Sequence, residues 1–258
     1  MNYLKLFAIA AFAIGAILYL AADDEHVVVG GDQDYDLGEY VKITVNSPVD
    51  LKIRSGGEYG LNVKADEADL KKLKIYVKGK TLVIENKKDI FNSWNGAPPE
   101  IMISLPLLQK FTLNSSSEVE INHIHGSFFK VMLNGSGSIL FDGTSDVLYA
   151  RINGSGTIDS GSFDVKKEAV IVINGSGDMS LAGKCRNLEA EINGSGDFTG
   201  RDFTCEKVEV DIAGSGDLDV YASAALDVDV IGSGTVNAFG KPQSVKDRSR
   251  KGTHVTIK

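Results

Sequence analysis

A Gly-Ser-Gly triplet that returns about every 20 residues is the feature that most constrains the fold of this 258-residue chain. Four of the six triplets follow an asparagine, and Asn114-Ser115-Ser116-Ser117 is a degenerate copy one period earlier. The triplets begin at Gly135, Gly154, Gly175, Gly194, Gly214 and Gly232. A repeat of this length is typical of solenoids, in which each copy stacks on the next.

Apolar and polar residues alternate between the triplets, and this alternation identifies the kind of solenoid. In one repeat Leu188, Ala190 and Ile192 share a face, while Glu189 and Glu191 point the other way. A period of two indicates β-strands rather than helices, and the leucine spacing of leucine-rich repeats is absent. We therefore expect an all-β fold, a parallel β-helix with coils of about 20 residues and equivalent strands about 4.8 Å apart.

The glycines have a mechanical explanation as the corners of the coils. Two glycines in the inward phase leave no side chain where the chain bends between two faces. The preceding asparagine tolerates left-handed backbone angles and can bond to its copy in the next coil. A phosphate-binding loop is excluded because no helix or lysine follows the triplet, and calcium-binding nonapeptide repeats have a different period.

The pattern divides the chain into five segments. Residues 1–22 are predicted to be a signal peptide or membrane anchor and 23–34 a linker. Residues 35–130 show irregular alternation and are predicted to form the first coils, which cap the β-helix. Regular coils follow over 131–240, and 241–258 form a basic tail with a final strand.

The first segment predicts the compartment. Lys5 precedes an uncharged apolar run from Leu6 to Ala22, and the acidic residues from Asp23 onward close it. This charge order exports the rest of the chain. The length of the run fits both a cleaved signal and an anchor through residues 4–22, whereas a buried helix is the alternative without export. We expect a protein of the bacterial periplasm or outer cell surface.

The repeated corners, the Pro-Leu-Leu-Gln-Lys-Phe stretch at 106–111 and the exported amino terminus resemble one known family. It is the auto-transporter adhesin head family, the GIN domain of bacterial envelope proteins, and the resemblance covers about Val41 to Gly240. The resemblance implies a right-handed β-helix, export and no known enzymatic activity. No lipid-anchor cysteine follows the apolar run, which is a departure from a lipid-tethered protein.

Charge narrows the range of partners. The net charge of -8 argues against a nucleic-acid partner, which would favour a basic surface. The segment from Val131 to Ala238 holds 17 acidic and 7 basic residues, a net charge of -10, so the regular coils form an acidic rod. A solvated surface that keeps the rod soluble explains this charge equally well. We expect a surface protein or a glycan as partner, and membrane contact only through the amino-terminal segment.

Three aspartates are the weak candidates for a metal site. Asp178, Asp197 and Asp217 each follow a Gly-Ser-Gly, so they are expected to stack as one column. Like charges about 4.8 Å apart repel, which would favour a bound cation or a raised carboxylate pKa. The alternative is a solvated ladder, because parity points the column toward solvent, where salt screens it.

Other chemistry-bearing residues are isolated. His123 and His125 are expected on one face of a strand, as a metal-binding or simply a surface pair. The segment Asn92 to Gly96 places Trp94 either in an exposed loop that stacks on sugar or protein, or in a plug that caps the coils. No serine has the sequence context of a hydrolase nucleophile.

The two cysteines are predicted to form a disulfide. Cys185 and Cys205 each lie nine residues before a Gly-Ser-Gly, so they occupy the same position in adjacent coils. In-register strands bring equivalent Cα atoms to about 4.8 Å, within the range of a disulfide. An oxidising compartment allows the bond, and two free thiols packed as small hydrophobic side chains are the alternative.

These observations predict a non-catalytic envelope protein without a cofactor. It would act in adhesion or scaffolding through a repetitive acidic surface. The alternative is a carbohydrate-active β-helix enzyme, either a polysaccharide lyase or a hydrolase, because such enzymes use the same fold. That enzyme would need carboxylates and basic residues that converge in a groove, and the sequence shows no such set.

Overall fold

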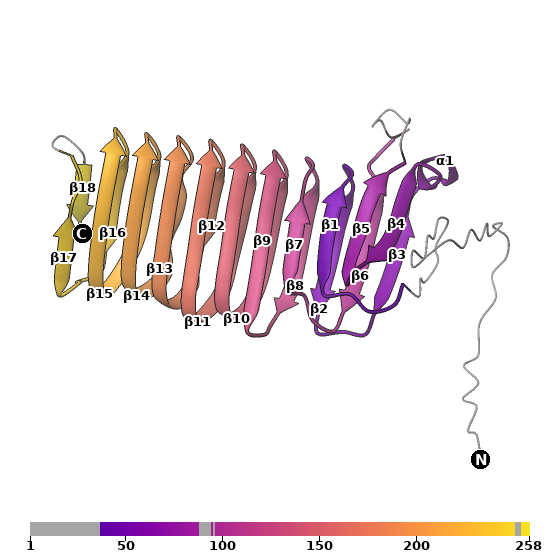
Figure 1. Cartoon of the computed structure of the whole chain (residues 1–258), viewed down its shortest axis with the longest axis horizontal. Helices are drawn as coiled ribbons and strands as arrows, with labels where there is room; N and C mark the ends of the chain where they lie inside the picture. Colours follow the sequence, from indigo (N-terminus) through magenta and orange to yellow (C-terminus); the bar gives the residue numbers. More distant parts are fainter. Residues whose placement is uncertain (1–36, 88–93, 95, 251–253) are drawn as a thin grey trace, which may run out of the picture.

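The chain forms a long rod of stacked β-coils (Figure 1), as the alternation predicts. The computed structural model describes residues 37–87, 94, 96–250 and 254–258. Within these ranges it contains 18 strands and one helix of 4 residues. The predicted signal or anchor over 1–22 and the linker over 23–34 lie outside the described residues.

The elements run in chain order as follows: β1 (Lys42–Asn46), β2 (Asp50–Ser55), β3 (Gly60–Lys64), α1 (Glu67–Leu70), β4 (Leu73–Lys78), β5 (Thr81–Asn86), β6 (Glu100–Leu105), β7 (Lys110–Leu113), β8 (Glu118–Ile124), β9 (Phe128–Gly135), β10 (Ser138–Gly154), β11 (Thr157–Gly175), β12 (Asp178–Leu181), β13 (Gly183–Gly194), β14 (Phe198–Gly214), β15 (Asp217–Gly232), β16 (Thr235–Phe239), β17 (Ser244–Asp247) and β18 (His254–Ile257).

Each coil contributes to two long faces that meet at the corner. We call the face whose strands run into the corner the upstream sheet, and the face whose strands leave it the downstream sheet. The upstream sheet contains β5, β1, β7 and β9 and continues through the carboxyl-terminal parts of β10, β11, β13, β14 and β15 to β17. Long strands such as β10 and β11 bend from the downstream sheet into the upstream sheet.

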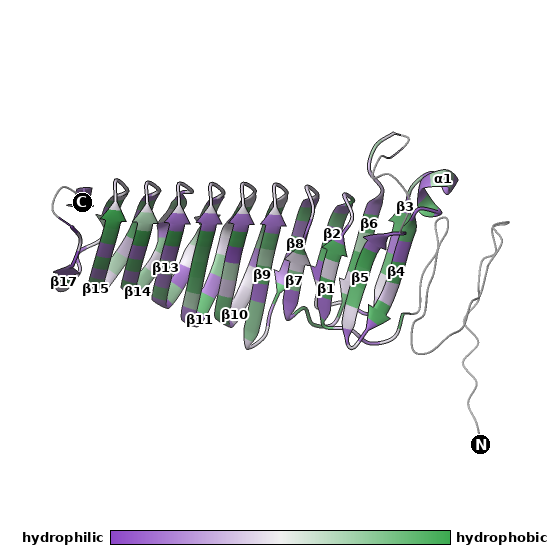
Figure 2. Ribbon diagram, turned by 45° about the horizontal axis from the view of Figure 1, so that its top comes forward, coloured by the Kyte–Doolittle hydropathy of each residue, from purple (hydrophilic) through white to green (hydrophobic). Residues whose placement is uncertain are grey.

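Successive regular coils pair in parallel and in register. Leu188, Ala190 and Ile192 align with Val208, Val210 and Ile212 of the next coil, and all six are buried. The outward partners alternate with them, which Figure 2 shows as bands of hydrophobic and hydrophilic colour along each strand. Burial of this aliphatic column provides the main driving force for stacking, since each coil alone would leave its inner face exposed.

The corners need glycine because consecutive coils leave no room for a side chain. Gly175 has φ of 126°, which other residues rarely adopt. A Cβ on Gly177 would collide with the carbonyl oxygen of Gly156 in the preceding coil. The left-handed angle falls on the first glycine of each corner, so the expectation that the asparagine carries it is wrong. The amide ladder is present: Asn134 donates to Asn114 at 2.7 Å and Asn153 to Asn134 at 2.6 Å.

The amino-terminal coils do not stack in chain order. β1 lies between β5 and β7 in the upstream sheet, and β2 lies between β6 and β8 in the downstream sheet. The coil formed by β5 and β6 therefore packs outside the coil formed earlier by β1 and β2. The alternation of apolar and polar residues predicts each of these strands, but it does not predict the order in which they stack.

The two ends of the rod differ. At the amino-terminal end β4 pairs antiparallel with β5, and β3 pairs antiparallel with β6. These strands reverse the parallel pattern and, together with α1, lie at the outer end of the stack (Figure 1). At the other end β17 and β18 extend the two sheets in parallel, with Val245 and Ile257 exposed.

Candidate functional site

The aspartate column forms a structural ladder. Asp178, Asp197 and Asp217 are exposed and stack in register. The backbone N–H of Asp197 donates to the carboxylate of Asp178 at 3.3 Å, and that of Asp217 donates to Asp197 at 2.8 Å. Thr235 continues the ladder by donating to Asp217. Each carboxylate thus satisfies a backbone donor of the next coil, which explains the residue type without a metal ion.

No metal site takes shape around these or other candidates in the described ranges. No group of three or more His, Cys, Asp or Glu side chains there could hold an ion. His123 sits at a bulge with φ of 61°, and β8 ends at Ile124. His125 lies beyond that end, with its ring nitrogen 3.2 Å from the carbonyl of His123. The expectation that both histidines share one face of a strand is therefore wrong, because the bulge interrupts the alternation.

The aromatic residues of the first coils serve the packing of the cap. Trp94 is half-buried against the core and donates its indole N–H to the carbonyl of Pro48 at 2.5 Å. Tyr40 is buried, and its ring lies 5.1 Å from that of Tyr59. Burial raises the pKa of Tyr40, and Tyr59 adds to the effect. Trp94 therefore has the role of a plug; most of the loop around it lies outside the described residues.

Cys185 and Cys205 are joined in a disulfide, with 4.5 Å between their Cα atoms. They are direct register partners in β13 and β14, as their equal offsets from the corner require. Both side chains are buried on the turn that joins the downstream sheet to the upstream sheet. The bond ties two regular coils together and lies far along the rod from the amino-terminal coils, so its role is structural.

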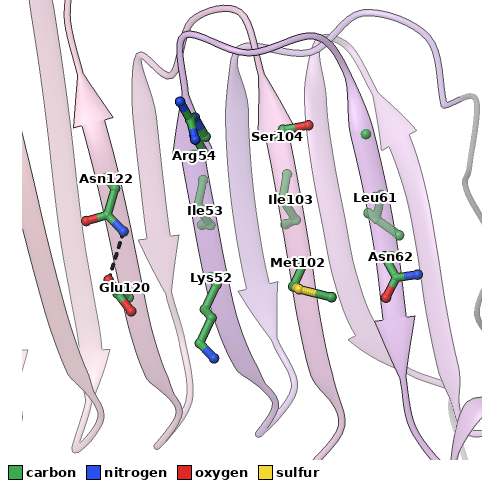
Figure 3. Close-up of a pocket in the computed structure, with 11 residues that line it drawn as sticks. Lys52, Ile53, Arg54, Leu61, Asn62, Met102, Ile103, Ser104, Glu120 and Asn122 are labelled. Atoms are coloured by element: carbon green, nitrogen blue, oxygen red, sulfur yellow. Dashed lines mark hydrogen bonds between the residues drawn. The ribbon is translucent and has the colours of Figure 1, made fainter.

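A shallow groove lies elsewhere, on the outer face of the downstream sheet near the amino-terminal end (Figure 3). It has a volume of about 410 Å³ and is formed over β2, β3, β6 and β8. Register sets its two outward rows. Asn62, Met102, Lys52 and Glu120 form one row, and Gly60, Ser104, Arg54 and Asn122 form the other. The out-of-order stacking of the first coils therefore creates the groove, because it brings β3 against β6 and β2 against β8.

The side chains of the groove leave unsatisfied polar groups beside an apolar patch. The guanidinium of Arg54 makes no hydrogen bond or ion pair with another described residue, whereas Asn122 donates to Glu120 at 2.8 Å. The side-chain oxygen of Asn62 is buried and has no hydrogen-bond partner among the residues that the structure describes. Met102 is 44% exposed and offers an apolar surface beside them. The groove can thus accept a polar ligand that carries an anionic group for Arg54.

The other two charged residues that line the groove have partners of different kinds: Lys52 is ion-paired with Glu100, and Glu120 accepts a hydrogen bond from Asn122. Lys52 lies 2.6 Å from Glu100. A hydrogen bond and the nearby charge raise the pKa of Lys52 and lower that of Glu100. Glu120 is the one carboxylate among the residues that line the groove. Glycoside hydrolysis generally uses two carboxylates on either side of the bond, so this lining suits binding better than hydrolysis.

Sequence reasoning missed the groove residues. Alternation places Lys52, Arg54 and Met102 on the outside of their strands, and this is correct. No repeat links β2, β3 and β6, so the sequence carries no signal that they become neighbours. One signal in the sequence was the absence of Gly-Ser-Gly before residue 135. The segment that lacks the triplet is the one whose strands do not stack in chain order.

The comparison with protein families completes this description. The family model "Putative auto-transporter adhesin, head GIN domain" matches residues 39–164 and 159–242. The chain belongs to this GIN-domain family. The match covers both the irregular and the regular coils, and the family resemblance read from the corners is confirmed.

Solved structures show the same fold at low sequence identity. A "putative adhesin" from Parabacteroides merdae is 14% identical, with a TM-score of 0.79 and coverage of 92% of this chain and 97% of that one. A second "putative adhesin", from Parabacteroides distasonis, is 18% identical, with a TM-score of 0.79 and coverage of 91% and 96%. A "putative lipid binding protein" from the same species is 21% identical, with a TM-score of 0.77 and coverage of 92% and 97%.

Among curated proteins, none matches the chain significantly. In the part of the chain that the structure describes, no helix has the length and apolar character to span a membrane.

Proposed function

We propose that this GIN-domain protein is a non-catalytic, adhesin-like protein of the cell envelope that binds an acidic glycan in the groove over β2, β3, β6 and β8. Membership of an adhesin-head family supports the adhesin-like role and an extracellular or envelope location. The observation that carries the ligand class is the guanidinium of Arg54, which has no hydrogen bond or ion pair with another described residue and lies in a groove that also presents amide and hydroxyl groups.

The chemistry of the groove fits a sugar that carries a carboxylate or sulfate. Arg54 can form a bidentate pair with such a group, which gives orientation as well as affinity. Asn62, Ser104 and Asn122 offer donors and acceptors for hydroxyl groups, and Met102 can contact an apolar sugar face. The open shape suits a chain that lies across the strands rather than a small molecule that is enclosed.

Binding to an array of neutral and acidic oligosaccharides tests the ligand class. We expect acidic sugars to bind and Arg54→Ala to weaken that binding at least tenfold, a change of about 1.4 kcal/mol. Arg186→Ala is the matched control, because Arg186 is an exposed arginine in the regular coils and should leave binding unchanged. Equal binding of neutral and acidic sugars, or equal loss in both variants, would contradict the acidic-glycan proposal.

Two further ligand and reaction classes are tested in parallel. The neighbour described as a "putative lipid binding protein" raises a lipid ligand, so vesicles of anionic and neutral phospholipid are included. The groove is lined by a single exposed apolar side chain, Met102, and we expect no vesicle binding.

A sugar-release assay on acidic polysaccharides, with and without calcium, addresses the enzyme alternative. Product formation that disappears in Asp197→Ala would overturn the non-catalytic proposal.

A further inference from the structure

The outer face of the upstream sheet is divided by charge along the rod. In-register pairing places one outward residue from each coil in a continuous row. From the amino-terminal end, that row reads Thr81, Lys42, Lys110, Lys130, Tyr149, Val170, Glu189, Glu209, Asp227 and Lys246. Three consecutive lysines are followed by an aromatic and an aliphatic residue and then by three consecutive acids.

The neighbouring row on the same face shares only the acidic part of this division, because it begins with the uncharged Thr44 and Thr112. Two positions further along each strand, Met132, Arg151 and Val172 lie in the middle coils, and Glu191, Asp211 and Asp229 follow. The face therefore has a basic half formed by one row of lysines, a largely apolar and aromatic centre at β10 and β11 that also holds Arg151, and an acidic half formed by both rows. The net count for Val131 to Ala238 does not reveal this division, because the three lysines precede residue 131 and the count sums over all faces of the coils.

Most of these charges have no partner within the described part of the chain. No ion pair joins Lys42, Lys110 or Lys130 to another described residue, and none joins Glu189 or Asp211. Lys130 does have one contact within the chain, since its Nζ lies 4.2 Å from the centroid of the Tyr149 ring. Mutual repulsion is evident in the acidic half. Burial raises the pKa of Glu189, and Glu209 and Glu168 raise it further. Burial and Glu209 likewise raise the pKa of Asp211. At the far edge Asp227 is already paired with Lys246 and Arg248, and Arg248 also lies 3.6 Å from the carboxylate of Glu209.

We propose that the upstream sheet docks a second copy of this chain, with the basic half of one copy against the acidic half of the other. A twofold axis parallel to the strands, between β10 and β11, turns the rod end for end but keeps strand heights unchanged. Lys130 then faces Glu189 of the second copy, Lys110 faces Glu209, and Tyr149 faces Val170. The contact is the same from both sides, as a closed twofold interface requires.

The size of the face is sufficient for a specific interface. Eight strands about 4.8 Å apart, each with three outward residues, cover roughly 700 Å² per copy, close to the 800 Å² or so of a standard interface. The centre of the contact would be Tyr149, Val170 and Val172, of which Val172 is already buried. Flat faces of sheets pack well on each other, and the flanking charges fix their register and direction.

Zero-length cross-linking of lysine to carboxylate tests the geometry directly. Lys110 and Glu209 lie five strand spacings apart in one chain, about 24 Å, so a direct amide between them can form only across two copies. Treatment of the full chain with a carbodiimide, followed by mass spectrometry, should yield Lys110–Glu209 and Lys130–Glu189 links. Links that join copies only through β17, β18 or the amino-terminal segment would overturn the proposal.

Charge reversal supplies an independent test with its own rescue. The variant Lys110→Glu/Lys130→Glu replaces two lysines of the basic half with acids, and Glu189→Lys/Glu209→Lys replaces two acids of the acidic half with lysines. We expect wild type to dimerise in 50 mM salt and its Kd to rise about tenfold or more in 500 mM salt, because salt screens exposed charges. Each variant alone should be monomeric, and a mixture of the two should form a heterodimer, as read by sedimentation velocity.

Controls separate docking from folding. Circular dichroism and the unfolding midpoint should show that both variants fold. The reversal Lys184→Glu/Asp202→Lys changes exposed charges on the turn side of the coils and should leave dimerisation intact. Wild type that stays monomeric in low salt, or a mixture that fails to associate, would overturn the proposal. So would association that survives both reversals.

Discussion

The regular coils and the amino-terminal coils of this protein build one continuous rod by different rules. In the regular coils each strand pairs with its own copy about 20 residues away, so chain order and spatial order agree. In the amino-terminal coils β1 pairs with β5 and β7, and antiparallel strands close the end. The comparison shows that a repeat makes stacking local in sequence, whereas a cap and a groove require pairing between dissimilar segments.

The corners show the same difference at the level of one residue. In the regular coils a glycine at the third corner position lets the preceding coil approach closely. In the degenerate corner Ser117 takes that position and bonds to a different segment. Its hydroxyl accepts the N–H of Val49 at 2.9 Å and donates to the carbonyl of Ser47 at 3.2 Å. The serine thus anchors the connection between β1 and β2, which the repeat alone could not hold.

The largest expected effect is a loss of stability in the regular coils. Ile192→Asp puts an unpaired carboxylate into the aliphatic column, where Ile192 is 1% exposed. We expect it to lower the free energy of unfolding by roughly 4 kcal/mol. Glu191→Asp, one residue away on the outer face, should cost less than about 1 kcal/mol. Denaturant unfolding of the two variants checks this, and equal stabilities would contradict the assigned faces.

Removal of the disulfide comes second and weakens the regular coils without touching the cap. The bond closes a short loop between residues 20 apart, for which the chain-entropy model gives about 3 kcal/mol. Cys185→Ala/Cys205→Ala should lower the free energy of unfolding by that amount. Thiol titration of the denatured, unreduced protein should find no free thiol. Two free thiols per chain would show that the bond does not form.

A pair of serine variants sharpens the comparison between the two kinds of corner. Ser117→Ala removes one of the two acceptors of the buried N–H of Val49, which keeps only the carbonyl of Ser47, and it also removes the hydroxyl donor to that carbonyl. We therefore expect a loss of about 1 kcal/mol. Ser195→Ala makes the same chemical change at an exposed serine in a regular corner and should cost less than about 0.5 kcal/mol. Urea unfolding of both variants provides the measurement. Similar costs would mean that the degenerate corner is held no differently from the regular ones.

The smallest expected effect is a shift in the pKa of one carboxyl group in each region. The shift is upward in the regular coils and downward in the amino-terminal coils. Burial and the charge of Asp178 raise the pKa of Asp159 in the regular coils. Lys52 lowers the pKa of Glu100 in the amino-terminal coils. The contribution of Asp159 to stability is therefore present at low pH and is lost as pH rises through its raised pKa. The contribution of Glu100 is present above its ordinary pKa and is lost as pH falls through its lowered pKa.

Carboxyl chemical shifts from NMR across an acid titration measure both values. The pKa of Asp159 should lie above the ordinary value of an aspartate, and the pKa of Glu100 should lie below the ordinary value of a glutamate. In Lys52→Met, Glu100 should return to its ordinary range while Asp159 is unchanged. A shift of both carboxyls in the same direction in the wild type would contradict the assigned contacts.

The sequence by itself determined the fold class, the corners, the faces of the regular strands and the register of the cysteines. These features follow from a period of two within strands and a period of about 20 between coils, because identical segments stacked in register repeat every contact. Cys185 and Cys205 could be aligned by counting from the corner, since no other segment intervenes between β13 and β14 at that point.

The tertiary structure alone decided the order of the amino-terminal coils, the groove at Arg54 and the charged division of the upstream sheet. Pairing of β1 with β5, or of β3 with β6, joins segments with no common repeat, so only their packing selects it. The hydrogen bonds of the aspartate column likewise depend on where backbone donors of the next coil fall. Lys110 and Glu209 are distant in sequence and belong to one face only because every coil between them is stacked in register.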